Sequence, residues 1–126
     1  MTEFDINAMV ERVTEKIYEK DPTLVERYGD KGRAKCIEDN HHHFKHLETA
    51  YELDNSTFFT EYAVWLNGIL QKFGMSVELL MDNFNFIIDV LRDEQQKHTQ
   101  ENTRIGIYID YLNQANHVLS EKSAAH

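Results

Sequence analysis

The sequence predicts an all-α protein, a bundle of five or six helices joined by short connections. A single Pro and five Gly among 126 residues leave little material for turns, which favours long helices over many short strands. Apolar residues recur at three- and four-residue spacing in every long segment, as expected for helices that bury one face. The length is that of one domain, so we expect a single helical domain over residues 1–126 with a polar tail at about 120–126.

The first helix is expected over residues 3–19, with Thr2 and Asp5 resembling a capping box at its start. Its apolar positions share one face: Ile6, Met9 or Val10, Val13 and Ile17. Asp21 and Pro22 should end it, and a short helix is expected over 22–28. The segment from Gly29 to Gly32 has turn chemistry and predicts a loop.

Four longer segments complete the predicted bundle. A central helix is expected over about 32–53, and a very apolar one over 57–73, capped by Asp54, Asn55 or Ser56 and ended by Gly74. A helix over 76–93 and a last helix after a polar break at 94–102 follow. We expect the apolar faces to meet in one core: Ile37, Phe44, Leu47, Leu66, Ile69, Phe84, Ile87 and Leu112.

Charge and cysteine content exclude several classes of function. The formal net charge of −9 argues against nucleic acid or anionic membrane as a partner, since both need a basic surface. The single Cys cannot form an internal disulfide, which favours a cytoplasmic location. The first residues do not resemble a signal peptide, and no apolar run approaches the roughly 20 residues of a membrane span.

The stretch from Arg33 to Leu47 is where we expect any chemistry of this protein. At helical spacing Arg33, Cys36 and His43 lie near one line. Asp39 follows Cys36 by three residues and precedes His43 by four. A thiol, a carboxylate and an imidazole should therefore edge the same groove.

The histidines of this stretch allow a metal site as one interpretation. His42 with His46, or His43 with His46, has a usable helical spacing, and Glu38 could be a third ligand. A di-iron carboxylate bundle needs two Glu-x-x-His motifs, and Glu38-x-x-His41 is alone in the sequence. A solvated polar face is the interpretation we favour, so no metal is assigned.

Haem and catalysis are both disfavoured. No His occurs between His46 and His98, so the later aromatic-rich helices lack a proximal haem ligand. Cys36 is the one candidate nucleophile, with basic neighbours that favour its thiolate and acidic neighbours that oppose it. No nucleophile elbow and no Gly-rich phosphate loop is present. We expect a protein that is not an enzyme, and a Cys that fills space in the interior.

Five aromatic residues in the helix predicted over 57–73 could line a pocket for a flat ligand: Phe58, Phe59, Tyr62, Trp65 and Phe73. Their helical spacing favours core packing for most of them. Phe58 and Phe59 are adjacent and cannot both point inward, so one of the two is expected to face a pocket or a partner.

Short motifs at similar spacing run along residues 33–92. Cys36-Ile-Glu-Asp39-Asn-His-His42-His43-Phe44-Lys45 is followed by Leu53-Asp54, Leu66-Asn67-Gly68 and Phe73-Gly74-Met75-Ser76. Their order resembles the phycobiliproteins, a globin-related family that carries bilins for light harvesting. The corresponding family segments are Cys-x-Arg-Asp-x-x-Tyr-Tyr-Leu-Arg, a Gly-Asp break, Leu-Asn-Gly and a Leu-Gly turn. The resemblance implies a globin-like bundle.

The resemblance also implies a site. In the family the Cys thiol forms a thioether to an open-chain tetrapyrrole, the Asp carboxylate bonds the pyrrole nitrogens, and basic groups pair with the propionates. The bilin-binding residues implied here are Cys36, Asp39, Arg33, Lys35 and His43. Glu38 stands where the family has Arg, His42 and His43 replace its tyrosines, and the N-terminal region is shorter.

A looser similarity links residues 47–91 to the helical cap that precedes cobalamin-binding domains, but the corrinoid-holding domain is absent from this sequence. We therefore expect a cytoplasmic, non-catalytic sensor or carrier of a bilin or another tetrapyrrole. The alternative is a ligand-free interaction or dimerisation module in bacterial signalling. In either case the aromatic content predicts a symmetric homodimer.

Overall fold

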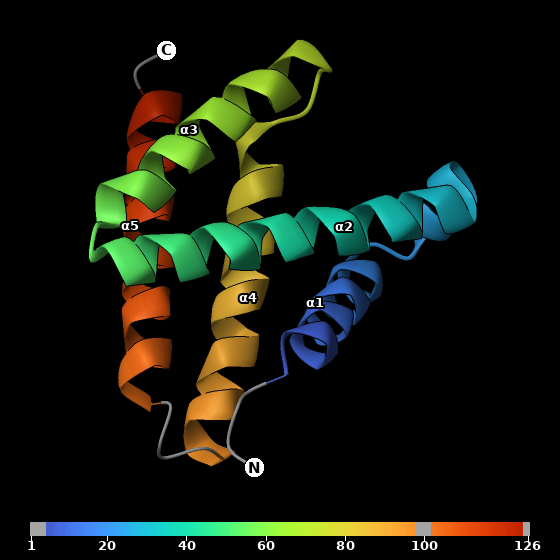
Figure 1. Ribbon diagram of the computed structural model, residues 1–126. Helices are drawn as coiled ribbons and strands as arrows, with labels where there is room; N and C mark the ends of the chain where they lie inside the picture. The colour runs from blue at the N-terminus through green and yellow to red at the C-terminus, as the bar shows by residue number, and fades with distance from the viewer. Residues whose placement is uncertain (1–4, 98–101, 125–126) are drawn as a thin grey trace.

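The computed structural model describes residues 5–97 and 102–124, which form five helices and no strand. They are α1 (Ile6–Lys20), α2 (Thr23–Leu53), α3 (Ser56–Lys72), α4 (Val77–Lys97) and α5 (Asn102–Ala124). The predicted all-α class is confirmed. Figure 1 shows α4 and α5 side by side, with α2 crossing them and α3 packed across their upper part. Helix α1 packs under α2 and against α4.

Helix α1 begins where a side chain satisfies its first free backbone groups. The carboxylate of Asp5 accepts a hydrogen bond from the Ala8 amide at 3.2 Å, so Asp5 is the N-cap. The predicted capping partner Thr2 lies outside the described residues. The helix ends at Asp21, whose amide donates to the Ile17 carbonyl at 3.1 Å. Met9, Val10 and Val13 are buried, as the predicted stripe requires.

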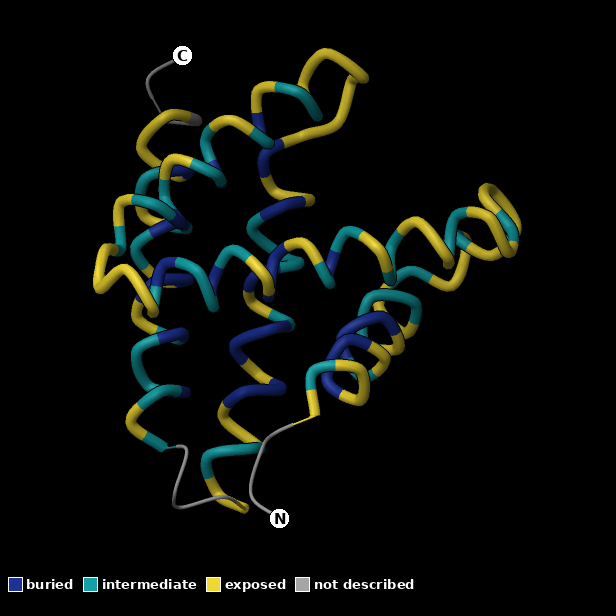
Figure 2. Tube along the Cα trace, viewed as in Figure 1, coloured by how far each residue is buried: buried dark blue, intermediate teal, exposed yellow. Residues whose placement is uncertain are grey.

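The predicted loop over residues 29–32 is wrong. Helix α2 continues through this segment, and Gly29 alone leaves helical geometry, with φ 60° and ψ −154°. Side-chain sterics close this region to residues with a Cβ, so one Gly is enough to kink the chain. The expected short helix and the central helix are therefore two arms of one element. Its first arm projects from the body and carries no buried residue (Figure 2).

The predicted boundaries of α3 are confirmed to within a residue. Asn55 is the N-cap, accepting from the Thr57 amide at 3.0 Å, and Gly74 follows the helix with φ 79°. The preceding break is made by Asp54, which takes a left-handed φ of 52°. This conformation is costly for most residues but is tolerated by Asp, whose short polar side chain can bond locally.

The last two helices are longer than predicted. Helix α4 continues past residue 93 to Lys97, with Arg12 of α1 pairing with Asp93 at 2.7 Å. Helix α5 continues to Ala124 and so includes most of the segment predicted as a polar tail. Exposed polar residues can extend a helix that is already anchored, because each added residue gains a backbone hydrogen bond after nucleation.

The core lies where α2 and α3 cross α4 and α5. Phe44, Leu47, Phe84, Ile87 and Leu112 have no exposed surface, which confirms most of the predicted core. Ile37 and Leu66 are half-buried and pack against it, and Ile69 is half-buried. Among the described residues, every helix is too short or too polar to span a lipid bilayer.

Candidate functional site

Cys36 faces the junction of α1 and α2 and is half-buried there. Burial raises the pKa of its thiol above the ordinary value, and Asp39 raises it further, while bonds with Thr14 and Asn40 and the charge of Arg33 act in the opposite direction. Burial is the largest of these effects, so the thiol is mainly protonated at neutral pH. A protonated thiol is a poor nucleophile and fits the space-filling role.

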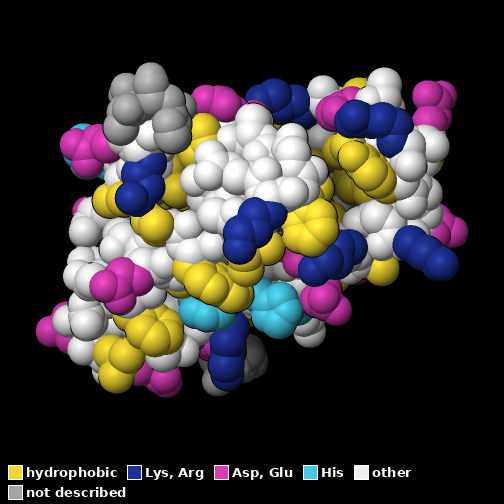
Figure 3. Space-filling model, turned by 90° about the horizontal axis from the view of Figure 1, so that it is seen from above, with side chains coloured by type: hydrophobic (Ala, Val, Ile, Leu, Met, Phe, Trp, Pro, Cys, Tyr) yellow, Lys and Arg dark blue, Asp and Glu magenta, His cyan; other side chains and the backbone are white. Residues whose placement is uncertain are grey.

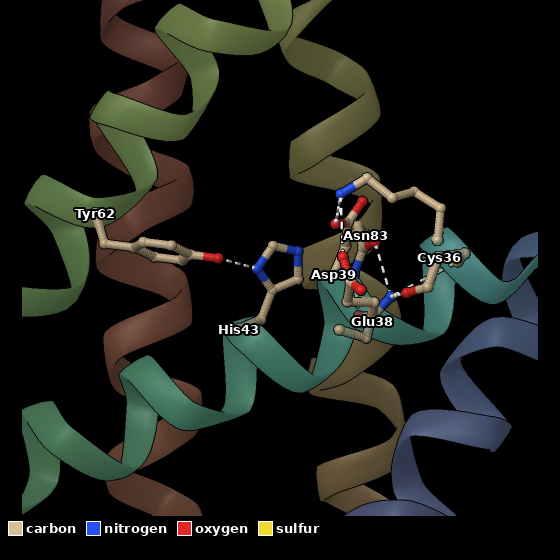
Figure 4. A network of polar contacts seen from close by, with 8 residues as sticks. Cys36, Glu38, Asp39, His43, Tyr62 and Asn83 are labelled. Atoms are coloured by element: carbon tan, nitrogen blue, oxygen red, sulfur yellow. Dashed lines mark hydrogen bonds and ion pairs between the residues drawn. The ribbon is translucent and has the colours of Figure 1, made fainter. Parts of the chain in front are cut away.

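The expected site residues around Cys36 point to different places. The Lys35 ammonium lies 2.7 Å from an Asp39 carboxylate oxygen and 3.5 Å from Glu38, and this pairing raises the pKa of Lys35 (Figure 4). These three side chains are on the exposed side of α2. The Arg33 guanidinium instead lies 5.5 Å from the centre of the Tyr18 ring on α1. Arg33 and Lys35 are therefore not directed at one common point.

An amide pair that the sequence analysis missed lies one turn beyond Cys36. Asn40 donates to the Asn83 amide oxygen at 3.2 Å and accepts from the Asn83 amide nitrogen at 2.7 Å. Asn40 also donates to the Cys36 carbonyl at 3.0 Å. Asn40 has no exposed surface, and its bonds satisfy the polar groups that burial removes from water. Its place four residues after Cys36, on the inner face, was the signal available in the sequence.

His43 is buried and makes its polar contact with α3. Its Nδ1 atom lies 2.7 Å from the Tyr62 hydroxyl, and the two side chains point toward one another in Figure 4. The ring also meets Phe84 edge-on, with centroids 5.2 Å apart. Burial, assisted by the charges of His46 and His42, lowers the pKa of His43 to about 3. His43 is therefore a neutral residue of the interior that joins α2 to α3.

His46 covers the outer side of the same tyrosine. Its ring stacks on Tyr62 with centroids 3.7 Å apart and 12° between planes, and its Nδ1 atom lies 2.8 Å from the His42 carbonyl. The described residues contain no group of three or more His, Cys, Asp or Glu side chains placed to hold a metal ion. His43 and His46 thus contribute to packing between α2 and α3.

A different surface stands out on α3. Five exposed residues follow one another at spacings of three or four and lie along one side of the helix; we call them the α3 stripe: Thr57, Glu61, Trp65, Gly68 and Lys72. Trp65 lies at its centre and is 62% exposed. Beside it is a shallow depression of about 310 Å³ lined by Thr60, Glu61, Val64, Trp65 and Val118. Figure 3 views the molecule from above and shows hydrophobic groups reaching the surface between charged ones.

The prediction that most of the aromatic residues of this segment pack in the core is confirmed: Phe59 belongs to it, and Phe58 and Tyr62 pack against it. Phe59 has no exposed surface, and its neighbour Phe58 is half-buried with its ring near His46. Trp65 and Phe73 are 62% and 75% exposed, so core packing does not extend to these two. Phe73 lies at the end of the helix and Trp65 on its outer side, where neither can reach the core.

Comparison of the chain with protein-family models, with curated proteins and with solved structures finds no match. The resemblance to phycobiliproteins and the globin-like form of the bundle therefore stay predictions.

Proposed function

We propose that this protein is a non-catalytic helical interaction module whose binding surface is the α3 stripe. The observation that carries the proposal is the exposure of Trp65, the single tryptophan of the sequence, beside an apolar depression. Tryptophan is among the residues that dominate binding energy when a partner removes them from water. An aromatic ring that is mostly exposed contributes less to the stability of the chain than a buried one.

The contrast with α2 supports this choice of surface. On α2 the titratable groups proposed for the bilin site include two with partners within the chain: His43 with Tyr62, and Lys35 with Asp39. On α3 the side chain of largest apolar area is turned outward, and Val64 and Val118 extend the apolar surface beside it. An apolar patch rimmed by charged residues such as Glu61 is typical of sites that bind another protein.

Fluorine NMR of Trp65 tests the proposal. Because the sequence has one tryptophan, 5-fluorotryptophan labelling gives one resonance from the α3 stripe. The labelled chain is titrated with unlabelled chain and, separately, with soluble extract of the cells that naturally produce it. We expect the resonance to shift and broaden in at least one titration, because docking changes the environment of the ring and slows its tumbling.

Two variants make this measurement specific. Gly68→Glu places a charge in the α3 stripe, where an added Cβ meets no atom within 4 Å, and should restore the resonance of the free chain. Ala34→Glu adds the same charge at an exposed position on α2 and should leave the broadening in place. A resonance unaffected by both titrations, or broadening that survives Gly68→Glu, would contradict the proposal.

Bilin binding is the second candidate. It is favoured by the placement of Cys36 and Asp39 one turn apart on α2, with the Lys35 ammonium beside the carboxylate. The test is the visible absorption spectrum of protein produced with bilin supplied. Covalent attachment predicts colour that survives denaturation and is lost in Cys36→Ala, whereas Asp39→Asn should keep attachment and shift the band. An unchanged spectrum in both variants would exclude this site.

A further inference from the structure

The α3 stripe carries two charged residues of opposite sign at equal distances from its centre. Glu61 lies four residues before Trp65, and Lys72 lies four residues after Gly68. The midpoint between Trp65 and Gly68 is therefore also the midpoint between the acid and the base. Four residues of helix span about 6 Å, so the two charges lie at matching distances on either side.

We propose that the partner of the α3 stripe is a second copy of this chain, docked with the two α3 helices antiparallel about a two-fold axis through that midpoint. This inference rests on the proposed function and names its partner. An antiparallel arrangement sets Glu61 of one copy against Lys72 of the other, twice, because a two-fold interface repeats each contact. It also brings Trp65 of each copy over Gly68 of the other.

The surroundings of these residues fit such an interface. Glu61 and Lys72 are exposed, and neither makes an ion pair with another residue that the structure describes. Both charges are thus available to a partner. Gly68 presents no side chain, and the space above it is open to at least 4 Å from a Cβ position. A Gly at a helix contact allows the backbones to approach closely and leaves room for the bulky ring of Trp65.

Charge complementarity favours a second copy over an unrelated partner. An acidic or basic target would match only one end of the stripe, whereas a reversed copy matches both ends at once. Each chain carries a net charge of −9, which opposes self-association at long range. At physiological ionic strength this repulsion is screened beyond about 8 Å, and the contacts of the stripe remain.

Charge exchange tested by analytical ultracentrifugation decides the inference. The dissociation constant of the dimer is measured at physiological ionic strength for the wild type, Glu61→Lys, Lys72→Glu and the double variant. Each single variant places like charges together at two symmetric contacts, so we expect association to weaken about tenfold or more. The double variant re-forms both pairs with the charges exchanged and should return to within a few-fold of the wild type.

Glu52→Lys is the matched control. It changes the net charge as Glu61→Lys does, but at an exposed residue of α2, so association should stay within a few-fold of the wild type. A chain that stays monomeric at high micromolar concentration overturns the inference. So does a dimer that ignores the single variants or is not restored in the double variant. If the chain is monomeric but extract still broadens the Trp65 resonance, the proposed function holds with a different partner; if neither occurs, both fail.

Discussion

The inner face of α2 and the outer face of α3 arrange their side chains in opposite ways. On α2 the polar groups turn inward and find partners, as His43 does with Tyr62 and Asn40 with Asn83. On α3 the indole ring of Trp65 faces outward and is mostly exposed to water. The polar residues of α2 thus stabilise the fold, whereas Trp65 on α3, a type of residue usually buried in a core, is available to contact a partner.

This difference shows that residue type alone does not locate a site. The thiol, imidazole and carboxylate of α2 are the groups that most often suggest chemistry, but burial and pairing determine what they can do. A buried histidine with a lowered pKa is neutral and closed to solvent. The exposed tryptophan has no reactive group, but it has apolar area that only a partner can remove from water.

The largest expected effect separates two aromatic residues. Phe84→Ala should lower the free energy of unfolding by about 3–5 kcal/mol, because the ring is fully buried between His43 and Phe59. Trp65→Ala should change that free energy by less than about 1 kcal/mol in the monomer, since the ring is mostly exposed. Urea unfolding at low micromolar concentration measures both. Equal losses of unfolding free energy in the two variants would contradict the assignment of Phe84 to the core and Trp65 to the exposed surface.

The second-largest expected effect is a loss of folding stability at acidic pH, caused by His43 on α2. The pKa of His43 is about 3 in the folded chain against 6.5 for the ordinary side chain, so the unfolded chain binds the proton first as pH falls. Stability is therefore full above pH of roughly 6.5 and is lost below it, by about 3 kcal/mol between pH 7 and pH 4. Urea unfolding of the wild type across this range measures the loss.

His43→Gln is the control for this pH dependence. Glutamine retains a side chain able to bond the Tyr62 hydroxyl but does not titrate in this range. The stability of the variant should fall less steeply than that of the wild type between pH 6.5 and pH 4. Parallel pH profiles would show that the loss comes from other groups and that His43 is not held neutral by burial.

Much of the fold could be predicted because the sequence signals for its helices depend on residues close together in the chain. The stripe of Val10 and Val13, the cap at Asn55 and the stop at Gly74 each follow from residues close in sequence. The segment 29–32 could not, since its turn residues compete with helix formation on both sides and only Gly29 leaves helical geometry. Four successive residues with turn chemistry do not show which of them kinks the chain and which continue the helix.

The candidate site was less predictable because burial depends on the packing of whole helices. The helical spacing of Cys36, Asp39 and His43 was predicted from the sequence, and all three residues lie on α2. The sequence could not predict that His43 would contact Tyr62 of α3, or that Asn40 would bond Asn83 of α4. The same limit applies to Trp65, whose place in an apolar helix suggested burial but whose position around the helix axis faces outward.

The smallest effect concerns two glycines. Gly68→Ala should stabilise the monomer by about 0.5–1 kcal/mol, because Ala is the better helix former and its Cβ meets no atom within 4 Å. The same change at Gly74, where φ is 79°, should instead destabilise by about 1 kcal/mol or more. Thermal unfolding of the dilute chain measures both signs. A loss of stability in Gly68→Ala would mean that this position is not free in the monomer.

The most direct test compares the two regions in one experiment on the fluorine resonance of labelled Trp65. Gly68→Glu alters the α3 stripe, and Asp39→Asn alters the exposed edge of α2; both residues are at the surface or partly so. Each variant is titrated with unlabelled chain and with extract as before. Our prediction is that Gly68→Glu returns the resonance to that of the free chain, while Asp39→Asn leaves it shifted and broadened. Loss of the effect in Asp39→Asn, with broadening retained in Gly68→Glu, would contradict it.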